Sequence, residues 1–287
     1  MPSFIEAGFL NIVATPHPKG VYKRLLNVAA ERPVSFWGPM KAAITEPLEL
    51  HDDPSFLTFQ LVIWTEVNPN EPAVNKTQLK KAAFPREGKS FVAEYGVNGR
   101  VFYCVFDVET HTLTAELRNE DGQTVSPRRL ERIFVDLLSP EVLGSDAEEV
   151  EVTVIPTDDA VEYVLGLTRL DKVEILVKRP NADDITSATQ QVMNELIEQN
   201  AKSERRVVTR QAKTDGIELS EENETYARVA AHNGYVDASG LDEDGEHDKR
   251  STREVPKVVR TAIAAGTSFL VALRGVAKLA REHHDKL

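Results

Sequence analysis

The stretch "FVAEYGVNGRVFYCVFDVETHTLTAELRNEDG", residues 91–122, is the part of the sequence that decides the fold. It holds three segments rich in β-branched and aromatic residues, and turn residues separate them at Asn98-Gly99 and between Glu109 and Thr112. Glu120-Asp121-Gly122 closes the last segment. The pattern predicts an antiparallel meander of three strands.

The segments around the meander predict an α+β fold. In the first half, residues 3–14 and 55–67 are β-rich runs, and residues 17–32 predict a short helix. A second helix is expected after Ser126, which can act as its N-cap, with a proline at the first helical position. We therefore expect residues 1–145 to form an N-terminal α+β domain that contains the meander.

The second half repeats the alternation of strands and helices. Strands are predicted at 148–156 and 170–181, helices at 157–167 and 182–200, and a strand pair that turns at Asn233-Gly234. A long C-terminal helix is expected from Ser251, because Ser251-Thr252-Arg253-Glu254 has the capping-box spacing. Residues 146–287 are thus predicted to be a second α+β domain with a basic connector and a basic terminal helix, and the sheets to be antiparallel or mixed.

Composition limits where the protein works. The chain has 287 residues, 41% of them hydrophobic, which is enough for a substantial core. Cys104 is its single cysteine, so no disulfide can form within the chain. The longest weakly polar run, residues 261–273, is too short to span a bilayer, and the N-terminus lacks the features of an export signal. We expect a cytoplasmic protein of a bacterial host that does not insert into membranes.

Charge is distributed in blocks along the chain, although the net charge is −12. Residues 201–213 contain five bases and one acid, residues 214–248 one base and eleven acids, and residues 249–287 nine bases and three acids. Two interpretations of the acidic block stay open. It can fold over the basic blocks and inhibit binding of a polyanion, or it can be a solvated loop that keeps the protein in solution.

The string after the second strand of the meander raises a catalytic alternative. Asp107 and Glu109 follow an apolar run, as in the first metal-binding motif of many 3′–5′ exonucleases. Two metal ions in one site need about four carboxylates. The other candidates, Asp136 and Asp285, lie inside a predicted helix and at the chain terminus. A hairpin turn with local hydrogen bonds is therefore favoured, and no catalytic residue, metal site or cofactor is predicted.

The expected C-terminal helix places six bases on one side. At 100° per residue, the six share a sector of roughly 120°. A solvated basic face is the ordinary explanation, and a surface that contacts phosphates is the functional one. The six are Arg253, Lys257, Arg260, Arg274, Lys278 and Arg281.

A family resemblance favours the functional explanation. The string "VIPTDDAVEYVLGLTRLDKVEILVKRPNADD", the helix after it, "NGYVDASG" and the terminal basic segment resemble the RexA-like phage-exclusion proteins of temperate phages. The resemblance implies a two-domain homodimer that binds double-stranded DNA with little sequence preference, with an architecture like the DNA-ring protein RdgC. It also implies a role in lysogen immunity or phage exclusion, with a membrane-protein effector as a further partner. The acidic block departs from this family.

The sequence therefore predicts a DNA-binding accessory protein that is not an enzyme. A metal-dependent nuclease and a protein-interaction component of a phage-defence or toxin module are the alternatives. The residues expected to contact DNA phosphates lie in a mobile connector and on the terminal helix: Arg205, Arg206, Arg210, Lys213, Lys257, Arg260, Arg274, Lys278 and Arg281.

Overall fold

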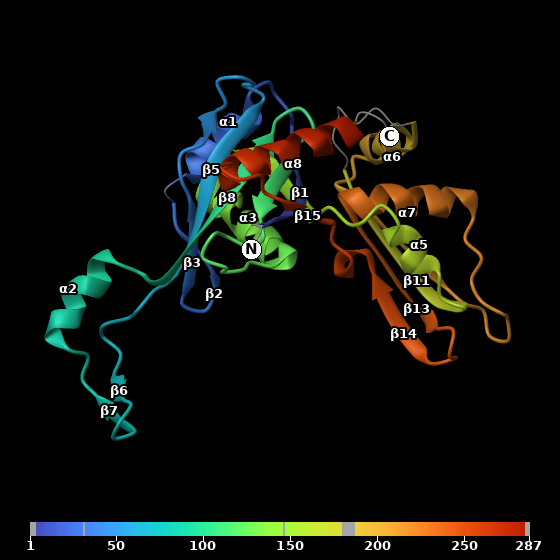
Figure 1. The fold of residues 1–287 in the computed structure, drawn as a ribbon. Helices are drawn as coiled ribbons and strands as arrows, with labels where there is room; N and C mark the ends of the chain where they lie inside the picture. The colour runs from blue at the N-terminus through green and yellow to red at the C-terminus, as the bar shows by residue number, and fades with distance from the viewer. Residues whose placement is uncertain (1–3, 31, 146, 180–186, 285–287) are drawn as a thin grey trace.

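The computed structural model describes residues 4–30, 32–145, 147–179 and 187–284 (Figure 1). A nine-stranded sheet forms the larger part of the molecule, with the order β10-β1-β9-β8-β5-β3-β2; β15 also pairs with β1, and β4 with β5. Every pair among these strands is antiparallel. The strands are β1 (Phe4–Thr15), β2 (Val34–Trp37), β3 (Met40–Ile44), β4 (Leu48–Glu49), β5 (Phe56–Thr65), β8 (Val97–Asp107), β9 (Thr112–Glu116), β10 (Glu149–Val154) and β15 (Val258–Ala262).

Helices cover both faces of this sheet because successive residues of a strand point to opposite sides. On one face, α1 (Val21–Ala29) and α3 (Pro127–Leu137) pack on a large apolar cluster that includes Leu10, Phe102 and Phe134. On the other face, α8 (Phe269–His284) packs on a smaller cluster. This cluster includes Phe9, which precedes Leu10 in β1 and points to the opposite side of the sheet. Between α3 and β10 lies the short helix α4 (Pro140–Leu143).

A second, four-stranded antiparallel sheet lies beside the first, with the order β12-β11-β13-β14. Its own apolar cluster includes Val173, Val192 and Tyr226 and is separate from the other two. The strands are β11 (Arg169–Lys178), β12 (Ser203–Thr209), β13 (Gly234–Leu241) and β14 (His247–Ser251). The helices are α5 (Ala160–Leu165), α6 (Ser187–Glu198), α7 (Glu221–Asn233) and the 3₁₀ turn η1 (Thr252–Glu254).

The fold class predicted from the sequence is confirmed, since antiparallel sheets and helices share the chain. Locally encoded elements match well: Ser126 caps α3 by accepting a hydrogen bond from Arg129 N, and β8 and β9 form the expected hairpin. Asn98-Gly99 does not separate two strands, because β8 continues through it, and the segment before it is helical. No helix in the described part of the chain is long and apolar enough to cross a membrane.

The prediction of a strand pair that turns at Asn233-Gly234 is wrong for the first strand. Residues 221–233 form α7, with Ser220 as the N-cap and three glutamates in the first turn. Favourable capping and several alanines stabilise this helix. Gly234 follows the end of α7 and begins β13, so the Asn-Gly pair is a helix-to-strand junction.

The predicted C-terminal helix is present as α8, but its predicted start at Ser251 is wrong. The capping-box residues form only a 3₁₀ turn, in which the Ser251 hydroxyl accepts from Arg253 N. The chain then enters β15, which pairs with residues 4–8 of β1, and α8 begins only at Phe269. Pro256 has no N–H to give a helix, and β-branched residues follow it, so pairing with the free edge of β1 is favoured.

The division into sheets differs from the expected division at residue 145. β10 and β15 pair with β1, and α8 covers a face of the first sheet. Only the segment from α5 to η1 forms the second sheet and its helices, which we call the second body. The first body is the nine-stranded sheet with its helices, and the chain leaves it after β10 and returns to it at β15.

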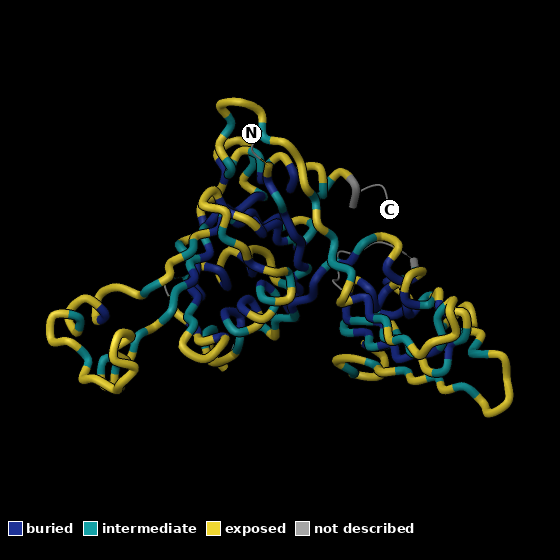
Figure 2. Tube along the Cα trace, turned by 60° about the horizontal axis from the view of Figure 1, so that its bottom comes forward, coloured by how far each residue is buried: buried dark blue, intermediate teal, exposed yellow. Residues whose placement is uncertain are grey.

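Residues 68–96, which we call the arm, project from the first sheet between β5 and β8 (Figure 1). The arm consists of a small hairpin, β6 (Ala73–Asn75) and β7 (Lys80–Ala82), followed by α2 (Arg86–Glu94). Most of it is exposed (Figure 2). At its root Thr65 pairs with Val97, and the Trp64 ring lies so close to Gly96 that a Cβ there would clash with it.

Candidate nucleic-acid interface

The nine bases predicted to contact DNA are spread over both bodies instead of forming one connector and one helix. Arg205 and Arg206 lie in β12, a regular strand of the second sheet, so the predicted mobile connector is wrong for these two, whereas Arg210 and Lys213 lie in the loop that follows. Lys257 precedes β15, and Arg260 lies within that strand. The other bases of the expected helical stripe lie on α8, so the stripe is not continuous.

The bases of the expected connector are held by acids of the second sheet. Arg205 Nη2 lies 2.8 Å from Glu174 Oε1, and Arg210 Nε lies 2.5 Å from Asp171 Oδ1. The hydrogen bond from Arg205, followed by that from Lys172, lowers the pKa of Glu174 to about 2. These arginine charges are therefore neutralised within the protein.

Arg206 is the most enclosed of the connector bases. Its guanidinium lies 3.3 Å from the centroid of the Tyr226 ring, and its Nη1 is 2.7 Å from Glu222 Oε1. Glu222 belongs to the acidic block, which is built mainly from α7 and the β13–β14 hairpin. At the turn of that hairpin, Asp242 accepts hydrogen bonds from Asp244 N and Glu246 N. The acidic block is thus part of the second body, not one flexible loop.

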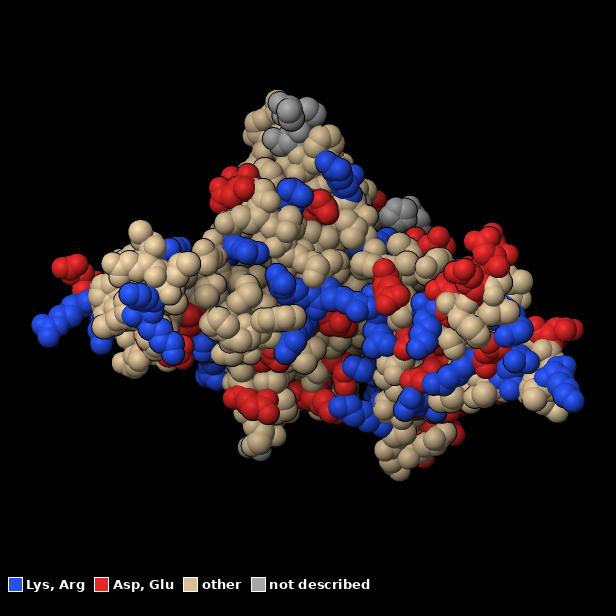
Figure 3. All heavy atoms as spheres, turned by 90° about the horizontal axis from the view of Figure 1, so that it is seen from below, with Lys and Arg blue, Asp and Glu red and all other residues tan. Residues whose placement is uncertain are grey.

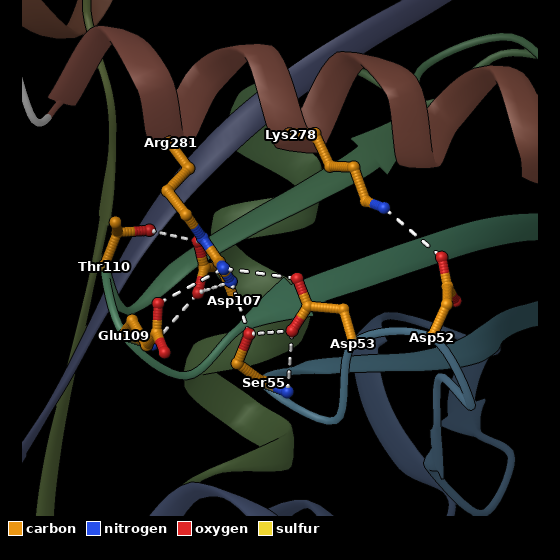
Figure 4. A network of polar contacts seen from close by, with 8 residues as sticks. All are labelled: Asp52, Asp53, Ser55, Asp107, Glu109, Thr110, Lys278 and Arg281. Atoms are coloured by element: carbon orange, nitrogen blue, oxygen red, sulfur yellow. Dashed lines mark hydrogen bonds and ion pairs between the residues drawn. The ribbon is translucent and has the colours of Figure 1, made fainter.

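The candidate nuclease string and the last base of the candidate stripe meet at one place (Figure 4). Asp107, 2% exposed, accepts 2.6 Å hydrogen bonds from Arg281 Nε and Nη2, one on each carboxylate oxygen. Glu109 N and Thr110 Oγ1 also donate to this carboxylate, both at 2.9 Å. The turn predicted to satisfy itself by local hydrogen bonds is present, and its aspartate also anchors α8.

Further acids surround the same guanidinium. Arg281 Nη1 lies 3.2 Å from Glu109 Oε2 and 3.4 Å from Asp53 Oδ2. Burial is the largest single influence and opposes the charge on Arg281, but the hydrogen bonds to Asp107 and the attraction of the surrounding acids together outweigh it and raise the pKa of Arg281. The guanidinium occupies the position between the acids where a cation would be held. Among the described residues, no group of three or more His, Cys, Asp or Glu side chains is arranged to hold a metal ion.

Ion pairs also hold Lys278 and Lys257. Lys278 Nζ lies 3.3 Å from Asp52, and Lys257 Nζ lies 2.8 Å from Asp158. Three of the nine bases make no ion pair within the described part of the chain: Lys213 is exposed in a loop, Arg260 lies over the Phe4 ring, and Arg274 is half-buried. The structure does not bring these three together on one element.

The arm carries bases of a different kind. Its Lys and Arg residues are all exposed, and none of them makes an ion pair or side-chain hydrogen bond with any residue that the structure describes, in contrast to six of the nine bases above. Figure 3 shows Lys and Arg side chains on the arm and in a band across the neighbouring body, with acids interspersed in that band. The arm bases are Lys76, Lys80, Lys81, Arg86 and Lys89.

Exposed apolar side chains accompany these bases. Phe91 and Tyr95 stack with their ring centroids 5.2 Å apart, and each is about half exposed. Leu79 at the end of the hairpin is 83% exposed, and Val74 is 62% exposed. A combination of free positive charge and exposed aromatic or aliphatic groups is typical of surfaces that bind nucleic acids.

The edge of the first sheet extends this surface toward the body. Trp37, 61% exposed, lies at the end of β2 and pairs with Met40, which in turn pairs with Thr65 at the root of the arm. The Arg132 guanidinium of α3 lies 5.8 Å from the centroid of the Trp37 ring and makes no salt bridge to the residues that the structure describes. A second basic and aromatic contact therefore lies beside the arm.

Sequence reasoning missed the arm, although a signal was present. Residues 76–89 contain five bases and only one acid, Glu87, the same balance as the block at 201–213. The preceding residues 68–76 are rich in asparagine and proline, which is the composition of an ordinary loop. Counting charge in short windows would have identified the arm, but not that its bases stay unpaired, because pairing depends on the tertiary structure.

Two comparisons bear on the identity of the chain. A family model described as "Domain of unknown function (DUF4747)" matches residues 3–278, which include both sheets, the arm and most of α8. No curated protein matches the chain.

Proposed function

The chain belongs to the DUF4747 family, and we propose that it binds double-stranded DNA without sequence preference, through the arm. The observation that carries this proposal is the set of five bases that form no ion pair with any described residue, on an element that projects from an otherwise acidic molecule. Bases without an internal partner gain most from neutralising phosphates, because no ion pair has to break first.

The shape of the arm supports the same proposal. It projects from the body, so a duplex can contact it without approaching the acids of the second sheet closely (Figure 1). Lysine is a compact charge on a flexible stem, and contacts to phosphates position a protein on DNA without reading its sequence. Trp37 and Arg132 at the root can extend the contact onto the body.

A charge-reversal experiment tests the proposal. Lys80, Lys81 and Lys89 are changed together to Glu, and duplex binding is measured by fluorescence anisotropy at low salt with random-sequence DNA. We expect the affinity to fall by about 100-fold or more, since several phosphate contacts are lost and like charges are introduced.

The matched control reverses three lysines away from the arm. Lys19, Lys213 and Lys249 are also exposed and unpaired, so their change to Glu alters the net charge equally. Affinity should fall much less in this variant. Equal losses in both variants would mean that net charge alone governs binding, and absence of binding by the parent protein would refute the proposal.

The proposal includes no cleavage of DNA. Because Arg281 occupies the centre of the acids around Asp107, we expect duplex and single-stranded DNA to stay intact in magnesium or manganese. Degradation that is abolished by Asp107→Ala would support the nuclease alternative instead.

A role in phage exclusion or lysogen immunity is part of the same proposal, and the resemblance to RexA-like proteins supports it. In a bacterial host, expression of the parent chain should lower the plating efficiency of a sensitive phage, and the arm reversal should restore it. Equal protection by the parent chain and the arm-reversal variant would place the defence activity outside the arm and favour a protein-interaction role.

A further inference from the structure

The tip of the arm hairpin is held in a fixed shape. Three residue pairs join β6 and β7, ending with Asn75 opposite Lys80, and residues 76–79 form the loop. The Asn75 side chain accepts hydrogen bonds from Thr77 N at 3.0 Å and from Gln78 N at 2.9 Å. The loop is therefore ordered by its own side chain and presents its last residue, Leu79, at the end of the ribbon.

Leu79 is unusual in both exposure and backbone conformation. It is 83% exposed, and its φ of 53° lies in the left-handed region, which favours glycine or asparagine. An aliphatic side chain at this position has a cost in backbone energy and gains no packing within the described structure. Residues held in such conformations are concentrated at functional sites.

Lysines surround this apolar tip. Lys76 begins the loop, and Lys80 and Lys81 follow Leu79; all three are exposed and make no ion pair with a described residue. Lysine is depleted from the centres of protein interfaces, whereas it is a principal phosphate contact in DNA complexes. The chemistry around Leu79 therefore suits the minor groove of a duplex, with phosphates on both sides, better than an apolar pocket of a protein.

We propose that Leu79 is a wedge that inserts between neighbouring base pairs from the minor groove, so that binding of the arm kinks the duplex. Apolar side chains on minor-groove binders unstack base steps and bend DNA in this way. The inference rests on the proposed function, since the lysines must first hold the duplex. Flexible steps such as TA should be preferred sites of insertion, although the protein reads no base edges.

The test measures bending and unstacking separately from binding. A duplex carries a donor and an acceptor at its ends, and a second duplex carries 2-aminopurine at a central TA step. The full-length parent protein, added to saturation, should raise energy transfer and 2-aminopurine fluorescence. Leu79→Ala and Leu79→Gly should remove both signals while lowering affinity by about 10-fold or less, because the phosphate contacts remain.

Two variants serve as controls. Val74→Ala shortens another exposed aliphatic residue of the same hairpin, away from the tip, and should keep both signals. Leu79→Met keeps an apolar side chain and should restore them. Because glycine adopts a positive φ readily, Leu79→Gly should fold at least as well as the parent.

The outcomes separate the two proposals. Full bending and unstacking by Leu79→Ala would reject the wedge and leave DNA binding by the arm intact. Failure of the parent protein to bind the duplex at low salt would refute the proposed function and the wedge with it. Binding by the parent without any bending or unstacking would also reject the wedge.

Discussion

Glu116 is an acid whose burial has a measurable consequence. At the end of β9 it is 1% exposed; its Oε2 accepts a 2.7 Å hydrogen bond from Tyr103 N, and its Oε1 has no hydrogen-bond partner. Burial raises the pKa of Glu116 to about 7, although the Tyr103 N–H opposes the shift. The folded protein therefore holds a proton that the unfolded chain loses near the ordinary glutamate pKa of 4.5.

This shift predicts that stability falls as the pH rises. Between the unfolded pKa and about 7 the folded state binds one more proton, so the free energy of unfolding should fall by about 1.4 kcal/mol per pH unit from this group. Glu116→Gln removes the titration and keeps an acceptor for Tyr103. Urea unfolding should show equal stability of variant and parent near pH 4.5 and a growing advantage of the variant up to neutral pH. Parallel pH profiles would contradict this prediction.

Arg281 and Asp107 make a second testable pair. Removal of one partner leaves the other charge largely buried, since their side chains are only 17% and 3% exposed. Arg281→Met, which keeps an apolar stem near Phe56, should lower the free energy of unfolding by about 3 kcal/mol. The double variant with Asp107→Asn should recover part of the loss. Lys278→Met, which removes the exposed pair with Asp52, is the control and should change stability little.

At the scale of elements, the arm is an addition to a body that is complete without it. None of its residues belongs to the three apolar clusters, and Val92 is its only buried side chain. An isolated two-stranded hairpin is marginally stable in water. The arm therefore contributes little to the apolar packing that stabilises the body.

Deletion of the arm should leave the body folded. Thr65 and Val97 are paired neighbours, so a short glycine-containing turn can replace residues 68–95. Calorimetry should place the melting temperature within about 4 °C of the parent value, because little buried apolar area is lost. DNA binding should be abolished at the same time. A collapse of the body on deletion would mean that the arm has a structural role instead.

At the scale of the molecule, the salt dependence of binding distinguishes the arm from the sequence-based set of bases. If the five arm bases contact phosphates, the slope of log Kobs against log salt should be about −4.5 per chain, whereas all nine predicted bases would give about −8. A titration over several salt concentrations measures this slope. A slope near −8 would require the internal ion pairs to open on DNA, and the arm would then be only part of the interface.

Local patterns in the sequence were enough to determine most elements and the fold class. The capped amphipathic helix α3 and the β8–β9 hairpin are encoded within a few residues, by capping, periodicity and turn chemistry. Where a local signal competed with a distant partner, sequence reasoning failed. Residues 258–262 became a strand because the free edge of β1, some 250 positions earlier, pairs with them.

The candidate site depended on tertiary structure still more. Charge is visible in the sequence, but whether a base is available to a ligand depends on the acids that the fold brings to it. Asp107 and Arg281 are 174 positions apart, and their meeting removes both a candidate metal ligand and a candidate DNA contact. The arm bases remain free for the opposite reason: the arm projects from the body, so no acid in the described ranges pairs with them. Local preference therefore determined the elements, and only long-range contacts decided which charges stay available.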